Sequence, residues 1–272
     1  MNLEAQLLDQ VNALIGELTG GVSTHADPFE ALVRYFNLCD RIPGVRRWQV
    51  SQSRFLKSQS LIKSIQQGLQ KFIDAARDGE DIRPWLHDAI FDDKQDGLMN
   101  DWGIQHYHLG KAFESGRGGR KRIGRTGELL YAMHRESVGN LYLIGIFDHG
   151  SFSEKQLLEI VNADWPDLLG HAKIKNVIDI SHSPSSPEIH QLRKNQINST
   201  VEINGEYFMG PGGGYTMSGH STKAVMKAQG VKRLMRSLQK EVDGMHLSIR
   251  FVVQNRSVVL VDETNNRHCQ IL

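Results

Sequence analysis

The chain has 272 residues, of which 39% are hydrophobic and 23% are charged. This composition is ordinary for a globular protein and excludes collagenous, low-complexity and wholly disordered classes. The 32 Lys and Arg residues nearly balance the 31 Asp and Glu residues, which excludes a uniformly basic nucleic-acid coat but not a local basic patch. At roughly 100–200 residues per domain, the length suggests two domains, or one domain with an elaborate periphery.

Leucines and valines at helical spacing predict a helix over residues 1–18, which Gly20 ends. Asp27 and Pro28 favour the start of a second helix, and a third is predicted over 51–76. We expect this helical region, residues 1–100, to pack on a following sheet domain and to offer a surface for a homodimer.

Two segments of opposite charge follow. Residues 74–101 contain nine acids and three bases, whereas 111–125 contain six bases and one acid. The acidic segment is either a solvated face or an internal lid near the basic loop. The glycine-bearing basic loop would hold a polyanion through its phosphates, and its candidate binding residues are Lys111, Arg117, Arg120, Lys121 and Arg122.

A small sheet domain is predicted over residues 101–180. Short strands are expected at 104–109, 128–135 and 141–148, and the last two should form a hairpin. A capping-box signature at Ser153–Gln156 predicts a helix to about Asn162.

The last third is predicted to form a second, smaller domain over residues 197–272, after a Pro- and Ser-rich linker at 181–196. Asn204-Gly205 indicates a hairpin, a helix should run to about Val242, and two strands should follow within 245–262. The fold class is therefore α+β: an N-terminal helical region, a small antiparallel sheet domain and a ββαββ-like C-terminal domain.

Three histidines are predicted to converge on the sheet. His106 and His108 occupy alternate positions of the first strand, so both point to one face and Tyr107 to the other. His149 directly follows the third strand, and the pairing of neighbouring antiparallel strands brings it toward the first two.

These residues suit RNA cleavage without a metal or other cofactor. An imidazole with an unperturbed pKa of ~6.5 serves as base or acid, so one takes the 2′-OH proton and another protonates the leaving 5′-oxygen. We assign the base to His106 or His108 and the acid to His149 or its partner. Arg125 would stabilise the negative charge on phosphorus, and Tyr131 would position the substrate.

The segment Arg125–Met133, together with Asn140–His149, resembles the sheet core of RelE-type ribonuclease toxins. In that family an Arg-led strand pairs with a hydrophobic strand that ends near polar catalytic groups. The resemblance covers about residues 104–165 and implies a small sheet packed on helices, endoribonuclease activity, a toxin or defence role and an antitoxin partner. Arg125 and Tyr131 match the pattern, whereas the histidines rest on the chemical argument alone.

Other interpretations of the histidines stay open. His106, His108 and His149 have the spacing of ligands for Zn²⁺, Fe²⁺ or Mn²⁺, and Glu114 makes the pattern similar to that of cupin metal sites. The three could also be half-buried structural residues. A non-catalytic nucleic-acid or protein-binding regulator is a third interpretation.

A second candidate site for phosphate is the glycine-rich stretch 210–223, which lacks the P-loop ending. Its loop amides and the helix that follows would face an anion, with Gly213, Gly214, Ser221 and Lys223 as contacts. That helix has no acidic residue from Gly219 to Lys240, so its basic face would suit RNA.

The predicted location is the cytoplasm. Cys39 and Cys269 match no zinc or disulfide spacing, which favours a reducing compartment. The first ten residues lack the pattern of a signal peptide. The longest apolar run, within Leu141–Phe147, falls far short of the ~20 residues of a membrane helix, so we expect no membrane association.

Overall fold

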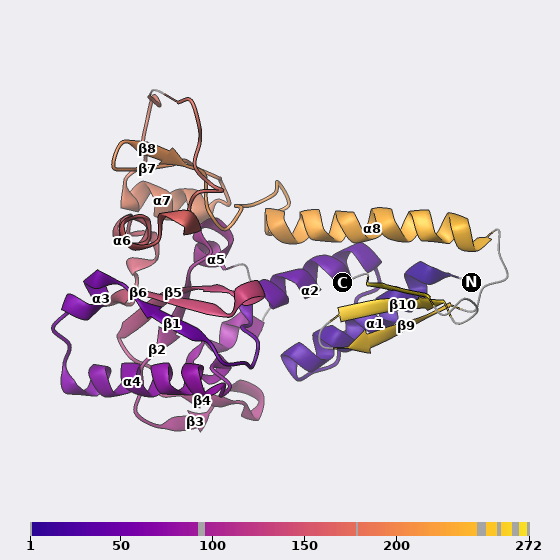
Figure 1. Cartoon of the computed structure of the whole chain (residues 1–272), viewed down its shortest axis with the longest axis horizontal. Coiled ribbons are helices and arrows are strands. Elements are labelled where there is room, and N and C mark those ends of the chain that lie inside the picture. Colours follow the sequence, from indigo (N-terminus) through magenta and orange to yellow (C-terminus); the bar gives the residue numbers. More distant parts are fainter. Residues whose placement is uncertain are drawn as a thin grey trace. The chain divides into compact units, whose positions relative to one another are not determined.

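The computed structural model describes residues 2–91, 96–177, 179–243, 249–254, 257–262 and 267–270. The chain forms two compact units, whose elements are labelled in Figure 1. The terminal unit combines Met1–Asp40 with Lys223–Leu272, and the central unit comprises Arg41–Thr222. The α+β class is confirmed, because both units combine helices with small sheets.

The terminal unit is built from both ends of the chain. Its helices are α1 (Leu3–Thr19), α2 (Pro28–Arg41) and α8 (Thr222–Asp243), and its antiparallel strands are β9 (Ile249–Gln254), β10 (Ser257–Asp262) and β11 (Arg267–Gln270). Asn2 caps α1, and Gly20 ends it with a positive φ of 67° that glycine adopts without strain. The predicted helices and the first two strands are confirmed, whereas β11 was not expected. The leucine stripe of α1 is buried, and the dimer remains a prediction.

The central unit is organised by a four-stranded sheet in the order β1-β6-β5-β2. The strands are β1 (Gln49–Gln52), β2 (Gln105–His108), β5 (Glu128–Arg135) and β6 (Asn140–Asp148). β1 is parallel to β6, and the other pairs are antiparallel, which confirms the predicted β5–β6 hairpin.

The single helix predicted over 51–76 is wrong. That segment contains the end of β1, then α3 (Arg54–Ser58) and α4 (Lys63–Asp78). Ser53 marks the boundary between β1 and α3. Its hydroxyl accepts the N–H of Leu56 as the cap of α3 and donates to the carbonyl of Ile144 on β6. A partner strand about 90 residues away thus overrides the local helical pattern.

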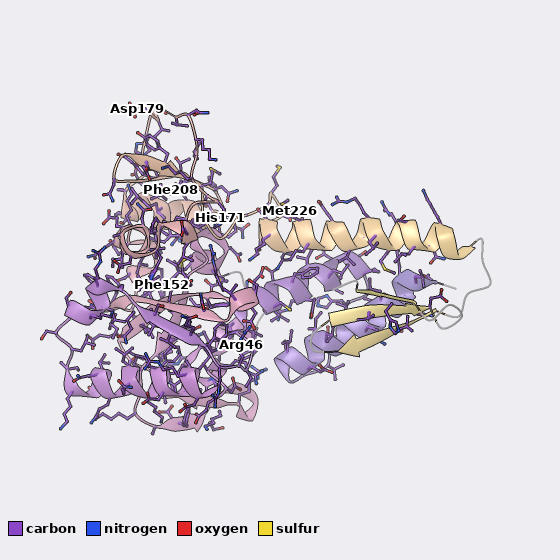
Figure 2. All side chains as sticks on the ribbon, in the orientation of Figure 1. Arg46, Phe152, His171, Asp179, Phe208 and Met226 are labelled. Carbon is purple, nitrogen blue, oxygen red and sulfur yellow. The ribbon has the colours of Figure 1, made fainter. Side chains whose placement is uncertain are left out.

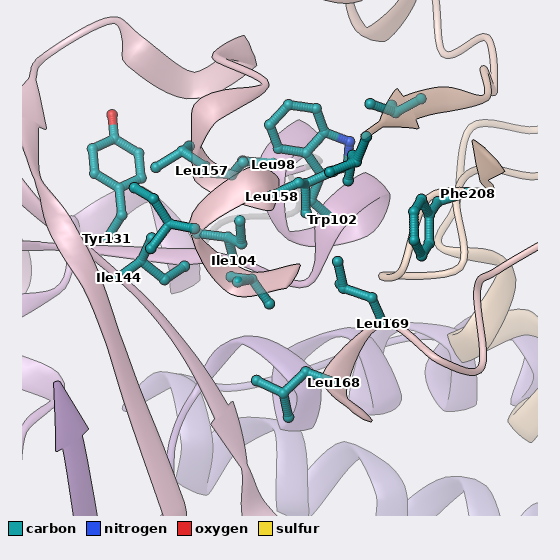
Figure 3. Close-up of a cluster of buried hydrophobic side chains, with 14 of the residues drawn as sticks. Leu98, Trp102, Ile104, Tyr131, Ile144, Leu157, Leu158, Leu168, Leu169 and Phe208 are labelled. Atoms are coloured by element: carbon teal, nitrogen blue, oxygen red, sulfur yellow. The ribbon is translucent and has the colours of Figure 1, made fainter. Parts of the chain in front are cut away.

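Helices cover both faces of this sheet. In Figure 1, α4 lies on one side of the strands and α6 (Gln156–Asp164) lies on the other. On the α4 side, Phe72 packs on Tyr107 with 4.7 Å between ring centroids. On the α6 side, the cluster in Figure 3 joins Tyr131 and Trp102 to the leucines of α6. Burial on both faces explains why β5 is apolar over Leu129–Ala132.

Smaller elements surround the sheet. The helices are α5 (Gly97–Trp102) and α7 (Ser186–Lys194), and the hairpins are β3 (Phe113–Ser115) with β4 (Lys121–Ile123) and β7 (Val201–Ile203) with β8 (Glu206–Phe208). Short 3₁₀ turns occupy Arg83–Trp85, Asp88–Phe91, Arg117–Gly119, Glu136–Val138, Ser151–Ser153 and Pro166–Leu168. Asn204 and Gly205 both have positive φ in the predicted β7–β8 turn. The predicted capping box at Ser153 is wrong, because α6 begins at Gln156 and has no side-chain cap.

These units differ from the predicted domains 1–100, 101–180 and 197–272. β7 and β8 contribute Val201, Ile203 and Phe208 to the core of the central unit, whereas α8 and the following strands belong with α1 and α2. The predicted linker 181–196 contains α7, which lies inside the central unit. No helix among the described residues is long and apolar enough to cross a membrane.

Candidate functional site

A cavity of about 670 Å³ lies in the central unit, a size that suits a small molecule or one nucleotide. Titratable and charged side chains from the sheet, from α7 and from the loop before α5 line it. The histidines are His87, His106, His149 and His190, the cations are Arg41, Arg193 and Lys194, and the carboxylate is Asp96.

Strand pairing places His106 and His108 as the alternation predicts. His106 pairs with Tyr131 and His108 pairs with Leu129, so both imidazoles share the α6 face. Their ring centroids are 6.5 Å apart. Tyr107 points to the opposite face and packs on Phe72 of α4.

His149 reaches the same cavity from the end of β6. Its backbone N–H donates to the carbonyl of Gly127 at 2.7 Å, which extends the β5–β6 pairing beyond the strand ends. Phe152 packs between His106 and His149. Its ring centroid lies 5.1 Å from that of His106 and 5.4 Å from that of His149. Figure 2 labels Phe152 beside the sheet. The predicted convergence of histidines from separate strands is therefore present in the structure.

His108 is a buried structural neighbour of the cavity. Its Nδ1 accepts the N–H of Thr126 at 3.2 Å, so the neutral ring carries its proton on Nε2. Burial, followed by the charges of His106, His87 and Arg125, lowers the pKa of His108 to about 4. The ring is neutral near pH 7 and does not line the cavity. Of the two predicted bases, only His106 is placed to meet a bound molecule.

His106 and His87 are the neutral imidazoles of the cavity wall. Burial is the largest cause that lowers the pKa of His106, and Asp96 partly opposes it. Burial also lowers the pKa of His87, and the positive charge of Arg125 acts in the same direction. Neutral imidazoles accept protons, so this side of the cavity favours a general base.

Neither Arg125 nor Tyr131 is among the residues that line the cavity. Arg125 is exposed, and its charge acts on His87 and His108, but it does not line the cavity. The fully buried ring of Tyr131 lies 6.4 Å from that of His106, and burial raises the pKa of its phenol. Its hydroxyl lies 3.5 Å from the carbonyl oxygen of Asp148. The two residues that the sequence predicted to contact the reacting phosphate therefore lie outside the cavity lining.

The predicted basic loop 111–125 is largely the β3–β4 hairpin, and three of its cations, Arg120, Lys121 and Arg122, have side-chain partners within the protein. Arg122 contacts Asp88 at 3.3 Å and Glu114 at 3.4 Å. Arg120 lies 4.2 Å from the Phe91 ring centroid. The Nζ of Lys121 lies 3.9 Å from the Phe113 ring centroid. Lys111 is exposed, and its backbone carbonyl accepts a hydrogen bond from the ammonium group of Lys71. The side chain of Arg117 lies outside the described residues. The Arg122–Asp88 ion pair joins the acidic segment 74–101 to this hairpin, in agreement with the prediction that the acidic segment lies near the basic loop.

The amides of Gly213 and Gly214 are occupied within the protein, so the phosphate contacts predicted for these two amides are wrong. The N–H of Gly213 donates to the carbonyl of Gly210, and that of Gly214 donates to Asn100. A Cβ on Gly212 would lie 2.5 Å from the Asn100 oxygen, which shows that glycine here permits close backbone packing on α5. Ser221 is buried, and Lys223 lies in the terminal unit, 3.6 Å from Asp40.

α7 supplies three of the site residues that were not predicted, and Arg41, His87 and Asp96 are others. His190, Arg193 and Lys194 have the i, i+3, i+4 spacing of one helix face, a signal that the sequence contained. Arg193 is buried and its Nε donates to Asp101 at 2.7 Å, while its guanidinium carbon lies 3.9 Å from the Trp102 ring centroid. Burial raises the pKa of Asp101 although Arg193 opposes the change.

The metal alternative requires three ligands at one point. In the part of the chain that the structure describes, no group of three His, Cys, Asp or Glu side chains is arranged to hold a metal ion. Glu114, the fourth candidate of the cupin-like pattern, contacts Arg122 instead. No family model matches the chain, and comparisons with curated proteins and with solved structures find no match either.

Proposed function

We propose that this protein is a metal-independent endoribonuclease whose active site is the histidine-lined cavity. One observation carries the proposal: His106 and His149, from different strands, line one cavity together with Arg193 and Lys194. Two imidazoles beside cations are the groups that cleavage of RNA by its own 2′-hydroxyl requires.

The roles follow from the environments. Because burial keeps His106 neutral, it takes the proton of the 2′-OH. The 2′-oxygen then bonds to phosphorus and the bond to the 5′-oxygen breaks. The exposed His149 donates its proton to that oxygen. Before the next turnover His106 releases its proton to water and His149 takes one up from water. The products are a 2′,3′-cyclic phosphate and a free 5′-hydroxyl. Each proton transfer contributes ~10²–10⁴-fold to the rate.

Arg193 and Lys194 take the role of charge stabiliser that the sequence suggested for Arg125. Both line the cavity, whereas Arg125 does not. Arg125 acts through the histidines instead, because its charge favours the neutral forms of His87 and His108.

The biological setting that fits this chemistry is a toxin or defence nuclease of the cytoplasm, held inactive by a protein partner. Support for that setting is the resemblance of 104–165 to RelE-type toxins. The small sheet covered by helices on both faces is compatible with it.

The test is cleavage of total RNA by the purified chain in the presence of EDTA. Single variants His106→Gln and His149→Gln should each lose about 10²-fold or more of the rate. His182→Gln is the matched control, because this exposed histidine lies outside the cavity. Salt-dependent RNA binding without turnover would replace the nuclease with the non-catalytic regulator. Full activity in either cavity variant would refute the site.

A further inference from the structure

Arg193 presents an unusually fixed guanidinium at the cavity wall. Its side chain is 7% exposed, its Nε donates to Asp101 at 2.7 Å, and its Nη1 donates to the carbonyl of Phe152. Its guanidinium carbon lies 3.9 Å from the Trp102 ring centroid, which fixes the plane. The guanidinium therefore cannot turn to follow a ligand, and the direction of its remaining nitrogen, Nη2, is fixed.

One nitrogen of this guanidinium is left without a partner among the described residues. Arginine carries five N–H donors, and Nη2, which holds two of them, is buried without a hydrogen-bond acceptor among the described residues. Buried donors in native proteins are nearly always satisfied, and one left open at a ligand cavity points to an acceptor that binds there. His106 adds a second buried atom of this kind, its Nδ1, on the same cavity.

The charge on the wall favours an anion. Arg41, Arg193 and Lys194 line the cavity, and Asp96 is the carboxylate that lines it among the described residues. Asp96 is directed to the protein, because its Oδ1 accepts the N–H of Met99 at 3.0 Å. The charge of Arg193 is offset by Asp101, so the exposed Lys194 supplies the excess positive charge at this end.

We propose that the α7 end of the cavity is a phosphate subsite, formed by Arg193, Lys194 and His190, that binds a phosphate monoester of a nucleotide. Phosphate oxygens accept charge-assisted hydrogen bonds from a guanidinium, and the two N–H groups of Arg193 Nη2 have no acceptor among the described residues. The inference rests on the proposed function in one respect: during RNA cleavage the subsite would hold the phosphate that reacts, whose charge Arg193 and Lys194 stabilise. Binding of a phosphate itself requires no cleavage.

The experiment is calorimetric titration of the full chain with inorganic phosphate and with adenosine 3′-monophosphate, at constant ionic strength. We expect saturable binding at one site for both. Arg193→Lys retains a charge for Asp101 but removes Nη2, so it should weaken binding about 10-fold or more. Lys194→Met should weaken it about 5-fold.

The controls separate the subsite from general charge and from catalysis. Lys57→Met removes an exposed cation of the central unit that does not line the cavity, and it should bind phosphate like the original chain. If Arg193→Lys fails to fold, the exposed pair His190→Gln with Lys194→Met decides the question. Absent binding, or equal binding in the α7 variants and Lys57→Met, would overturn the subsite. Phosphate binding without RNA cleavage would contradict the proposed nuclease activity and support the phosphate subsite. RNA cleavage without phosphate binding would support the nuclease activity and contradict the subsite.

Discussion

Replacing Arg193 with methionine removes the charged partner of a buried carboxylate while it keeps much of the apolar stem. The side chains of Arg193 and Asp101 are 7% and 6% exposed, so water cannot compensate for the loss. Breaking a buried ion pair from one side costs about 3–5 kcal/mol, and the lost contact with Trp102 adds about 1 kcal/mol. We therefore expect Arg193→Met to lower the free energy of unfolding by about 4–6 kcal/mol.

The pH dependence of that loss provides an independent check. Burial raises the pKa of Asp101 in the folded protein, and Arg193 holds this rise back. Without Arg193 the folded-state pKa rises further, so the folded protein binds more protons than the unfolded chain. Its stability is then highest below the unfolded pKa, ~3.9, and falls as the pH rises through the folded pKa. The loss in free energy of unfolding that Arg193→Met causes should therefore become smaller as the pH is lowered.

Urea unfolding followed by tryptophan fluorescence measures both effects across a pH series. The double variant Asp101→Asn with Arg193→Met should recover part of the stability, because no buried charge remains unpaired. A loss below 1 kcal/mol at pH 7, or a double variant no more stable than Arg193→Met, would refute the account of this pair.

Further predictions follow from the same contacts. The rate of RNA cleavage should fall as the pH falls through the lowered pKa of His106, below ~6.5, because the base is then protonated; a rate that rises on acidification would contradict its role. Arg125→Gln should raise the pKa of His108 from about 4, as measured by NMR titration, and an unchanged value would contradict the charge effect. Gly212→Ala should destabilise the protein by ~1–3 kcal/mol, since its Cβ would lie 2.5 Å from the backbone oxygen of Asn100 on α5 and 2.7 Å from the nitrogen of Gly103, which follows α5. Gly170→Ala, with its nearest contact at 3.8 Å, is the control for thermal unfolding and should be nearly neutral.

Local patterns predicted the elements whose partners lie nearby in sequence. Alternation and a short turn were sufficient for β5 and β6, and the leucine spacing was sufficient for α1. β1 was missed because its partner, β6, is about 90 residues away and its own four residues carry no strand pattern. The terminal unit was missed for a related reason: its core is shared by two ends of the chain, and no local signal links them.

The site was predicted where strand geometry decides side-chain direction. His106 follows from alternation, and His149 follows from its place after β6. Charge alone was a poor guide, because cations of the basic hairpin, such as Arg122, are used within the fold. Arg193 escapes the sequence prediction because the Pro- and Ser-rich segment that contains α7 is typical of a linker.

The most direct test of the central claim is the rate of RNA cleavage in excess EDTA, compared between the original chain and His106→Gln. The account predicts sustained cleavage by the original chain, 2′,3′-cyclic phosphate at the new ends, and a rate in the variant lower by about 10²-fold or more. Cleavage that stops on chelation, or that continues equally in the variant, would contradict it.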